Sequence, residues 1–518
     1  MSKMSNSLGW LLGIAMCGVS VSGHCVHAQI VPDSTLPNNS TVNINGDIFN
    51  ITGGTQAGSN LFHSFKEFSV RTGSEAHFNN TLDFQNIISR VTGSSVSNID
   101  GLIKVLQGNA NLFLLNPNGI VFGPNARLDI RGSFVGSTAN SIKFADGFEF
   151  NAKNAQSTPL LTVSVPLGLQ FGANPQRIQV QGDGQGIRRT DLLEDTQNAL
   201  RVQSNQTLAL VGGEISLEGA TLKTAGGRIE LGSVSGEGLV SLTPIKTGFS
   251  LGYGNVQNFG NIELSKQATV DASGAGGGDV RVIGRQISLT NGSTIEASTL
   301  GSQSGGSLVV NALELLQVIG TSSDGQIRSA LAAIVYPEAN GAGGELMINT
   351  GVLLVRDGAM ITTSTLSSGK AGNLTVNAPE AVQVIGVSAK GPSLLSARTY
   401  NKSATAGAGG NLTINTGTLL LRDAAQISAT TYGAGKAGNL TVNATKGVQL
   451  IGTTVDGQFG SGLYAQADRG STGAAGDLTI NTTKLLVQDG AEAAASTFGT
   501  GNGGNLTVRG STSDWYWS

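Results

Sequence analysis

The stretch "GGNLTIN", residues Gly409 to Asn415, decides the fold because versions of it recur at regular intervals along the chain. Its second glycine, Gly410, has counterparts at Gly278, Gly306, Gly344, Gly372, Gly438, Gly476 and Gly504. The residue numbers advance by 28 and by 38 in turn, so the sequence repeats every 66 positions and each repeat contains two related half-units. A period of this length indicates a structural unit that stacks on copies of itself along one axis.

Each half-unit has the pattern of short β-strands. Apolar residues stand two and four places after the marked glycine, as at Leu412 and Ile414, and this alternation predicts a strand with one buried face. A run such as "GVLLVRDGAMITTST" (351–365) adds two more short strands separated by a turn at Arg356-Asp357. Three short strands and three turns make one coil of an all-β, single-stranded parallel β-helix. The 3.6-residue period of a helical solenoid and the regular turn pairs of a β-propeller are both missing from the sequence.

An asparagine recurs five places after the marked glycine in six half-units: Asn311, Asn349, Asn377, Asn415, Asn443 and Asn481. Stacked coils would bring these side chains together, so we expect a structural ladder in which each amide bonds to the copies above and below. The extra residues of the longer half-units, as in "TTVDGQFGSGLYAQADRGSTG" (453–473), are expected to form a loop that projects from one face.

Residues 1–28 have the pattern of an export signal peptide. Lys3 precedes an apolar run from Leu8 to about Val21, and small residues offer a cleavage site near Ala28. No later apolar stretch reaches the roughly 18 residues of a membrane helix. Once this segment is removed, the protein is therefore expected to be soluble or surface-associated.

Both cysteines, Cys17 and Cys25, lie in the segment that would be removed, so the mature protein would have none. Secreted domains that are small often rely on disulfides. Two interpretations stay open: the chain must remain unfolded while it crosses a narrow pore, or a large β-core needs no covalent staple.

Composition narrows the class of partner. Lysine plus arginine number 31 and aspartate plus glutamate 34, with no basic block, so a nucleic-acid-binding surface is not expected. Glycine supplies 75 of the 518 residues and charged residues only 13%. The glycines follow no collagen triplet, and 39% apolar content is enough to build a core.

The stretch "ANLFLLNPNGIVFGPNARLDI" (110–130) sets three short apolar runs against two turns. Pro117 supplies a fixed φ, and Asn118 and Gly119 tolerate the tighter geometry that follows; "GPNA" (123–126) repeats the device. Two turns and three strands predict a coil of the same β-helix, although its sequence differs from that of the repeats.

Five motifs in the first part of the chain resemble the amino-terminal secretion domain of filamentous-haemagglutinin-type exoproteins, especially cyanobacterial ones. They occur in the family's order: "NLFHSFKEFSV" (60–70), "NIISRVTG" (86–93), "IDGLI" (99–103), "NLFLLNPNGIVFGPNA" (111–126) and "GSFVGSTA" (132–139). The resemblance implies two-partner secretion, in which periplasmic domains of an outer-membrane β-barrel transporter recognise the exoprotein. It also implies that the chain folds outside the cell as a right-handed parallel β-helix, secreted from or held at the surface of a Gram-negative-type bacterium.

The same resemblance indicates the residues of the secretion motif: Asn116, Pro117, Asn118, Gly119 and Ile120, with Phe65 and Phe68 as further candidates. Each could support the fold of the secretion domain or contact the transporter directly. A second "NPNL" motif of some family members is absent, which leaves the subfamily open. The domain organisation expected is a signal peptide (1–28), a secretion domain (29–200), β-helical repeats (201–510) and a tail (511–518).

For the repeats, the sequence predicts only a broad class of function. We expect a non-enzymatic adhesin or surface-interaction protein with a cell-surface or glycan ligand and no cofactor or metal. One alternative is a β-helix polysaccharide-processing enzyme, and another is a truncated structural remnant of a larger exoprotein. Asp357, Asp423 and Asp489 recur once in each repeat at the same place and are interpreted as turn residues, while His63 and His77 belong to no catalytic constellation.

Overall fold

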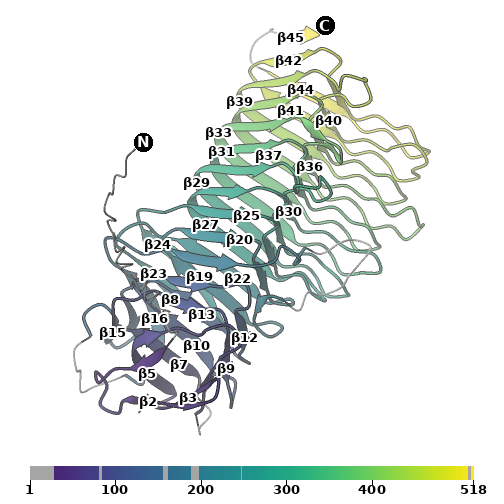
Figure 1. The fold of residues 1–518 in the computed structure, drawn as a ribbon. Helices are drawn as coiled ribbons and strands as arrows, with labels where there is room; N and C mark the ends of the chain where they lie inside the picture. The colour runs from purple at the N-terminus through teal and green to yellow at the C-terminus, as the bar shows by residue number, and fades with distance from the viewer. Residues whose placement is uncertain are drawn as a thin grey trace, which may run out of the picture.

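The structure, a computed structural model, describes residues 29–80, 84–155, 162–187, 198–246, 248–510 and, for the backbone alone, 515–517. The expected signal peptide and most of the expected tail lie outside these residues. The described part of the chain contains no helix, and so none that could cross a membrane. It is a rod of stacked coils that runs from the N-terminal to the C-terminal region (Figure 1).

Three columns of parallel strands run along the rod, which confirms the all-β parallel β-helix. Column 1 carries the repeat motif and consists of β5 (Asn60–Phe68), β7 (Asn86–Val91), β10 (Asn111–Leu115), β13 (Phe134–Ser137), β19 (Thr207–Gly212), β22 (Arg228–Ser233), β27 (Asp279–Leu289), β29 (Ser307–Ile319), β31 (Glu345–Arg356), β33 (Leu374–Ile385), β37 (Leu412–Arg422), β39 (Leu440–Ile451), β41 (Leu478–Thr482) and β44 (Leu506–Arg509).

Column 2 adjoins column 1 and contains β8 (Ser97–Ile99), β11 (Ile120–Phe122), β17 (Ile178–Gln181), β20 (Ile215–Glu218), β25 (Ile262–Ser265), the second halves of β27, β29, β31, β33, β37 and β39, then β42 (Leu485–Gln488) and β45 (Trp515–Trp517). Column 3 contains β3 (Ile48–Gly53), β6 (Glu75–Phe78), β9 (Leu102–Val105), β12 (Arg127–Asp129), β18 (Leu200–Arg201), β21 (Thr221–Lys223), β26 (Thr269–Asp271), β28 (Thr294–Glu296), β30 (Ala330–Ala332), β32 (Met360–Thr362), β36 (Leu394–Ser396), β38 (Gln426–Ser428), β40 (Gly462–Tyr464) and β43 (Glu492–Ala494).

One half-unit of the sequence is one coil of the rod. Leu346 pairs with Leu308 of the coil before it, across the longer interval of the repeat, and with Leu374 of the coil after it, across the shorter interval. The expectation of separate strands in columns 1 and 2 is wrong for these coils. Both lie in one long strand, such as β31, with a register shift between Asn349 and Val352. A bulge bends a strand without ending it, so Gly351, Pro379 and Gly417 at this corner lie within continuous strands and not in turns.

The marked glycines lie where successive coils come closest. A Cβ on Gly410 would stand 1.7 Å from the carbonyl oxygen of Gly372, and one on Gly438 would stand 1.8 Å from that of Gly410. The neighbouring atoms belong to backbone and cannot move aside, so only glycine fits at this position of each coil.

Most of the extra residues of the longer coils form a hairpin loop between columns 2 and 3. These loops cover 320–329, 386–393 and 452–461, and the second contains β34 (Val387–Ser388) and β35 (Gly391–Pro392). In the shorter coils a tight turn replaces the loop. Its first residue, Asp357, Asp423 or Asp489, has a φ of 57°, 58° or 57°. Aspartate tolerates this left-handed conformation, which explains its recurrence.

The first coils differ from the repeats because a second sheet covers column 1. Antiparallel strands form this cover: β14 (Ser141–Phe144), β15 (Glu149–Asn151), β16 (Pro166–Phe171), β23 (Gly238–Ile245) and β24 (Gly248–Val256). In β10, Leu112 and Leu114 pack into the core of the rod, whereas Phe113 and Leu115 pack into a second core under the cover. Burial of both faces accounts for the continuous apolar run "NLFLL".

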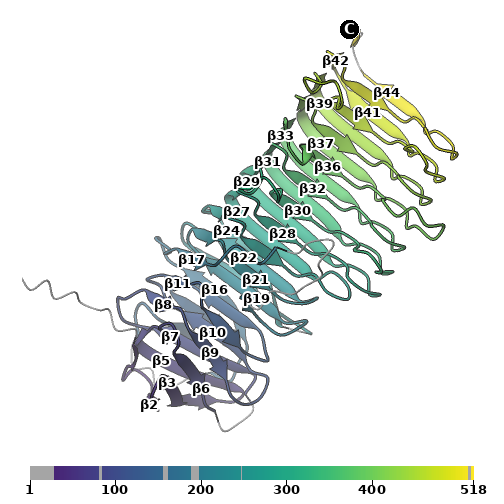
Figure 2. The same ribbon diagram turned by 45° about the vertical axis from the view of Figure 1, so that its right-hand side comes forward.

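The N-terminal end of the rod is closed by antiparallel pairing. Strand β1 (Ile30–Pro32) and β4 (Thr55–Ala57) pair with β5, and β2 (Ser40–Asn45) pairs with β3. Unpaired strand edges invite association with other chains, so this cap protects the first coil. Figure 2 shows the cap at the purple end of the rod, with later coils stacked regularly above it.

Candidate functional site

The "NPNG" turn joins β10 to β11 and fastens two coils together. Asn116 is fully buried, and its amide nitrogen donates to the backbone oxygen of Ser95 and to Oγ of Ser97, both at 2.9 Å. The half-buried Asn118 donates from its own amide to the backbone oxygen of Gly93 at 2.7 Å. The polar groups of the turn are thus satisfied by the preceding coil, as buried polar groups require.

The other residues of the expected motif complete this turn. Gly119 has a φ of 116°, a conformation that side-chain-bearing residues rarely adopt, and its N–H donates to the backbone oxygen of Asn116 at 3.1 Å. Pro117 is buried. Ile120 is also buried, and its strand lies between Ser97 of β8 and Ile178 of β17.

Phe65 and Phe68 lie in the first coil of column 1, away from the "NPNG" turn. Both are buried, and their rings contact each other edge to face with centroids 5.2 Å apart. His63 stacks on Phe65 at 6.0 Å and shares a hydrogen bond of 3.0 Å between its Nδ1 and Oγ of Ser40. Burial lowers the pKa of His63 to about 3, so this ring is a neutral part of the core at physiological pH.

A polar cluster ties the N-terminal segment to the first coils. The carboxylate of Asp33 accepts hydrogen bonds from Oγ1 of Thr35 at 2.7 Å, Oγ of Ser64 at 2.8 Å and Oγ1 of Thr92 at 2.5 Å. These hydroxyls outweigh the effect of burial and hold the pKa of Asp33 below its usual value.

Arg90 extends this cluster to the antiparallel cover. Its guanidinium donates to Oγ of Ser64 and Oγ1 of Thr35, each at 2.9 Å, and to the backbone oxygen of Asn151 in β15 at 2.6 Å. It also lies over the ring of Phe150, 4.2 Å from the centroid. One side chain therefore joins the N-terminal segment, column 1 and the cover.

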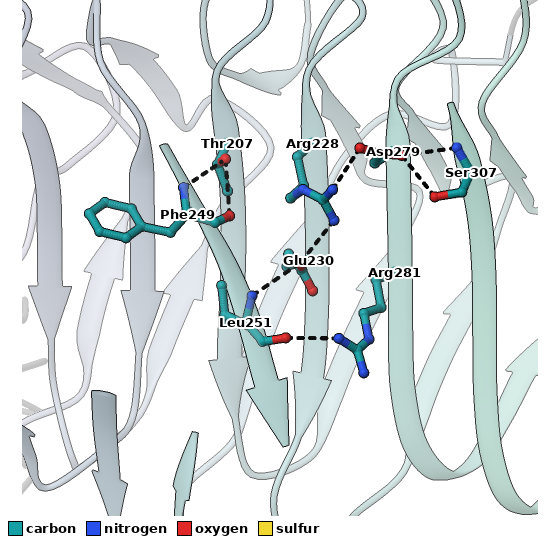
Figure 3. Close-up of polar contacts among 8 residues, drawn as sticks. All are labelled: Thr207, Arg228, Glu230, Phe249, Leu251, Asp279, Arg281 and Ser307. Carbon is teal, nitrogen blue, oxygen red and sulfur yellow. Dashed lines mark hydrogen bonds and ion pairs between the residues drawn. The ribbon is translucent and has the colours of Figure 1, made fainter. Parts of the chain in front are cut away.

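A second polar cluster holds the other end of the cover to the rod (Figure 3). Glu230 of β22 has no exposed surface; its Oε1 lies 3.3 Å from Nη1 of Arg228 and accepts from the backbone N–H of Leu251 in β24 at 3.3 Å. Arg281 of β27 donates to the backbone oxygen of Leu251 at 2.8 Å. Burial raises the pKa of Glu230 to about 7, against the opposing charges of Arg228 and Arg281.

Two further contacts in Figure 3 extend the attachment. Thr207 of β19 both accepts from the N–H of Phe249 and donates to its carbonyl oxygen, at 3.2 and 3.3 Å. Arg228 pairs with Asp279 at 2.6 Å, and Asp279 accepts from the backbone and side chain of Ser307 in the next coil. Hairpin β23–β24 is thus bonded to three successive coils.

A family model of the TPS (two-partner secretion) secretion domain matches residues 28–282. These residues belong to the TPS secretion domain family. The match begins at the expected start of the mature chain and runs past residue 200 to residue 282. The second core that the cover builds draws its side chains from the same part of the chain, between Leu36 and Ile283. The TPS secretion domain is therefore the part of the rod that carries the cover.

A solved structure shares this fold. The crystal structure of the HMW1 secretion domain from Haemophilus influenzae aligns at 16% identity and a TM-score of 0.54, over 91% of this chain and 100% of that chain. The crystal structure of a filamentous hemagglutinin secretion domain aligns at 16% identity over 67% of this chain and 99% of that chain. Its TM-score of 0.31 is too low to describe a common arrangement. No curated protein matches the chain.

The structure shows connections within the TPS secretion domain that sequence reasoning missed. Asp33, Arg90 and Glu230 were not singled out, although each is a charged residue within an apolar or neutral run in a chain with only 13% charged residues. That scarcity was the available signal, because buried charges need partners. In the described part of the chain no group of three or more His, Cys, Asp or Glu side chains is placed to hold a metal ion.

The six asparagines of the repeats lie outside the TPS secretion domain and hydrogen-bond in series. From Asn349 onward, the amide nitrogen of each asparagine donates to Oδ1 of the asparagine one coil earlier. The five distances, from Asn349–Asn311 to Asn481–Asn443, are 2.8, 2.9, 2.8, 2.8 and 2.7 Å. This ladder is structural in its contacts, since every internal asparagine uses both ends of its amide within the stack.

Proposed function

We propose that this two-partner secretion exoprotein is exported through an outer-membrane β-barrel transporter and acts outside the cell as an adhesin. The observation that carries the proposal is the TPS secretion domain over residues 28–282, followed by a rod of regular coils. Residues 1–28 would direct the chain across the inner membrane, and the TPS secretion domain would then be recognised by the transporter's periplasmic domains.

The geometry favours a folding role for most of the secretion motif. Asn116, Phe65 and Phe68 are buried in the folded domain, so after folding they contribute to its packing and not to its surface. We propose that they act by making the first coils a stable platform on which later coils stack. Asn118 is half-buried, so of the motif's polar residues it is the better candidate for direct contact.

The experiment compares release of the chain into the medium with and without the cognate transporter, for wild type, Asn118→Ala and Asn125→Ala. Asn125 is a matched control: it follows a proline in the next turn, but it is exposed and its N–H bonds to Asp100 instead of the "NPNG" network. We expect release to require the transporter and to fall with Asn118→Ala only. Release that does not depend on the transporter would refute the proposed export route.

A stability measurement on the same variants separates the two roles of the motif. If Asn118→Ala lowers release and the urea midpoint together, the residue supports the fold. If release falls at an unchanged midpoint, the side chain contacts the transporter. For the repeats, incubation with a panel of polysaccharides tests the competing enzymatic class, because release of oligosaccharides would contradict the adhesin role.

A further inference from the structure

The outer face of column 3 forms a cleft along the repeats. A cleft of about 610 Å³ is floored by residues of β28, β30 and β32 and walled by hairpin residues such as Arg328 and Lys390. Hairpin loops recur in every second coil, at 386–393 and 452–461, beside later strands of column 3. We call the cleft, together with the outer face of the column 3 coils stacked after it as far as Tyr432, the column 3 groove. Arg398, Tyr400 and Tyr432 lie on this continuation and not in the cleft itself.

Two arginines flank β36 of column 3, because Arg328 bonds to the backbone just before this strand and Arg398 follows it. Arg328, in the first hairpin, donates to the backbone oxygens of Gly358 and Pro392. Arg398 lies beyond β36 and donates to Oγ of Ser428 at 2.8 Å and to Oε1 of Gln426 at 3.2 Å. Burial and then the charge of Arg398 lower the pKa of Arg328 to about 10, so both guanidiniums are positive at neutral pH.

Neither guanidinium has a carboxylate to pair with among the residues that the structure describes. The charged or ionisable groups that act on them are tyrosines and each other: Tyr400 for both, and Tyr432 and Tyr464 for Arg398. The two carboxylates that line the cleft, Glu296 and Asp324, have interactions of their own. The printed hydrogen bonds of the two guanidiniums go to neutral oxygens, so an anion could add the charge-assisted bond that they lack.

Aromatic rings flank the arginines. Tyr400 and Tyr432 stand at the same position of successive coils, with centroids 5.1 Å apart and planes 2° apart, and Tyr400 is 38% exposed. The guanidinium of Arg398 lies 5.9 Å from the centre of the Tyr432 ring. Aromatic faces carry partial negative charge and attract the C–H groups of a sugar ring, while amides and hydroxyls such as those of Gln426 can bond sugar hydroxyls.

We propose that the column 3 groove binds a linear acidic polysaccharide whose carboxylates pair with Arg328 and Arg398. A guanidinium matches a carboxylate with two parallel hydrogen bonds, which supplies both charge and orientation. The sugar rings lie against Tyr400 and Tyr432. A nucleic acid fits less well, because a net charge of −3 and a sequence without a basic block do not favour a densely charged polyphosphate. The inference rests on the proposed adhesin role and names its ligand class.

The test measures binding of alginate oligosaccharides, a polymer of uronic acids, to the purified full chain. Neutral dextran and double-stranded DNA serve as comparison ligands. The variant Arg328→Gln/Arg398→Gln removes two charges in the groove, and Lys446→Gln/Lys484→Gln removes two exposed charges at the corner between columns 1 and 2. We expect the groove variant to bind alginate about tenfold or more weakly, because charge-assisted hydrogen bonds are lost, and the control variant to match wild type.

A charge-retaining variant separates the loss of charge from poor folding of the glutamine variant. Arg328→Lys/Arg398→Lys keeps both positive charges, and we expect it to bind more tightly than the glutamine variant. On wild type, bound alginate should also protect Arg328 and Arg398 from the arginine reagent phenylglyoxal, read out by mass spectrometry. This measurement needs no variant.

Three results would each overturn the proposal. Wild type could bind dextran or DNA as tightly as alginate, or the control variant Lys446→Gln/Lys484→Gln could lose as much affinity as the groove variant. Bound alginate could also fail to protect the two arginines from phenylglyoxal. These outcomes are independent of export, since they use purified protein. Transporter-dependent release without alginate binding would therefore support the export route and refute only the proposed ligand. Alginate binding without transporter-dependent release would support the ligand and refute the export route.

Discussion

Oδ1 of Asn116 accepts two hydrogen bonds from Asn118, one from its backbone N–H and one from its side-chain amide, both at 3.0 Å. The two asparagines therefore form one unit: Asn116 closes the turn on itself and holds Asn118 in position to reach Gly93 in the coil before. The turn works as a clamp between coils, and both of its asparagines are needed.

Replacing Asn116 by alanine is expected to destabilise the TPS secretion domain by about 2–3 kcal/mol, because Oγ of the buried Ser97 and the backbone N–H of Asn118 would lose their hydrogen-bond partner. The urea midpoint of the full chain, compared with that of Asn125→Ala, measures this loss. A midpoint equal to that of the control would mean that the clamp does not support the fold.

The glycine stack gives a second prediction. Gly438→Ala places a Cβ 1.8 Å from the carbonyl oxygen of Gly410, and the overlap is expected to cost about 3 kcal/mol or more. Gly447→Ala in the same coil is the matched control, because its nearest neighbour would be 3.6 Å away. Thermal melting of the two variants should show a lower midpoint for Gly438→Ala alone. Equal midpoints would contradict the close approach of the coils.

In the asparagine ladder, the stability cost of a substitution is expected to depend on whether the asparagine lies inside the series or at its end. Asn415→Ala removes two ladder bonds and leaves Asn377 and Asn443 each without one partner, whereas Asn481→Ala removes the single bond to Asn443. Each bond is expected to contribute about 1 kcal/mol, so the internal substitution should be about twice as costly. Urea unfolding of both variants checks the ratio. A larger effect at Asn481 would show that the bonds are not the source of the stability.

The buried carboxyl group of Glu230 is expected to make the stability of the fold depend on pH. Its pKa is about 7 in the folded protein and 4.5 without burial, so the folded state binds the proton more tightly. Its contribution to stability is therefore full below pH 4.5 and is lost as the pH rises to about 7. The charged groups that face it are Arg228, Arg281 and, through Arg228, Asp279.

Glu230→Gln removes this titration. Relative to wild type, the variant is expected to gain stability between pH 5 and pH 8, by on the order of 2 kcal/mol. Urea midpoints at the two pH values measure the gain, and Glu263→Gln, an exposed glutamate on β25, is the control. A difference between variant and wild type that stays constant with pH would show that Glu230 remains ionised in the fold.

The repeats made the rod predictable. A coil is a local object: the glycine, the alternating apolar residues and the asparagine recur at one spacing, and each finds its own copy in the next coil. The pattern of column 1 and the turn at Asp357 followed from the sequence for that reason. The corner between columns 1 and 2 did not, because Gly351, Pro379 and Gly417 mark a bulge within a continuous strand there and not a turn that ends one.

The antiparallel cover was not predictable in the same way. Strands β16 and β23 pair although β17 to β22 all lie between them in the chain, and neither belongs to the repeat. Their apolar side chains could as well have been read as further coils. The continuous apolar run in β10 was a sign that both of its faces are buried, but not of what buries the second face.

The sequence by itself determined that this chain forms stacked β-coils and carries the motifs of a TPS secretion domain, because periodic residues meet their own copies and such contacts can be read from spacing alone. Tertiary structure decided which charges are buried together. Arg90 meets Asn151, Glu230 meets Leu251, and Arg328 meets Pro392 because segments from different coils converge there. The partners have no common spacing, and their interaction depends on a burial that exists only once the rod has formed.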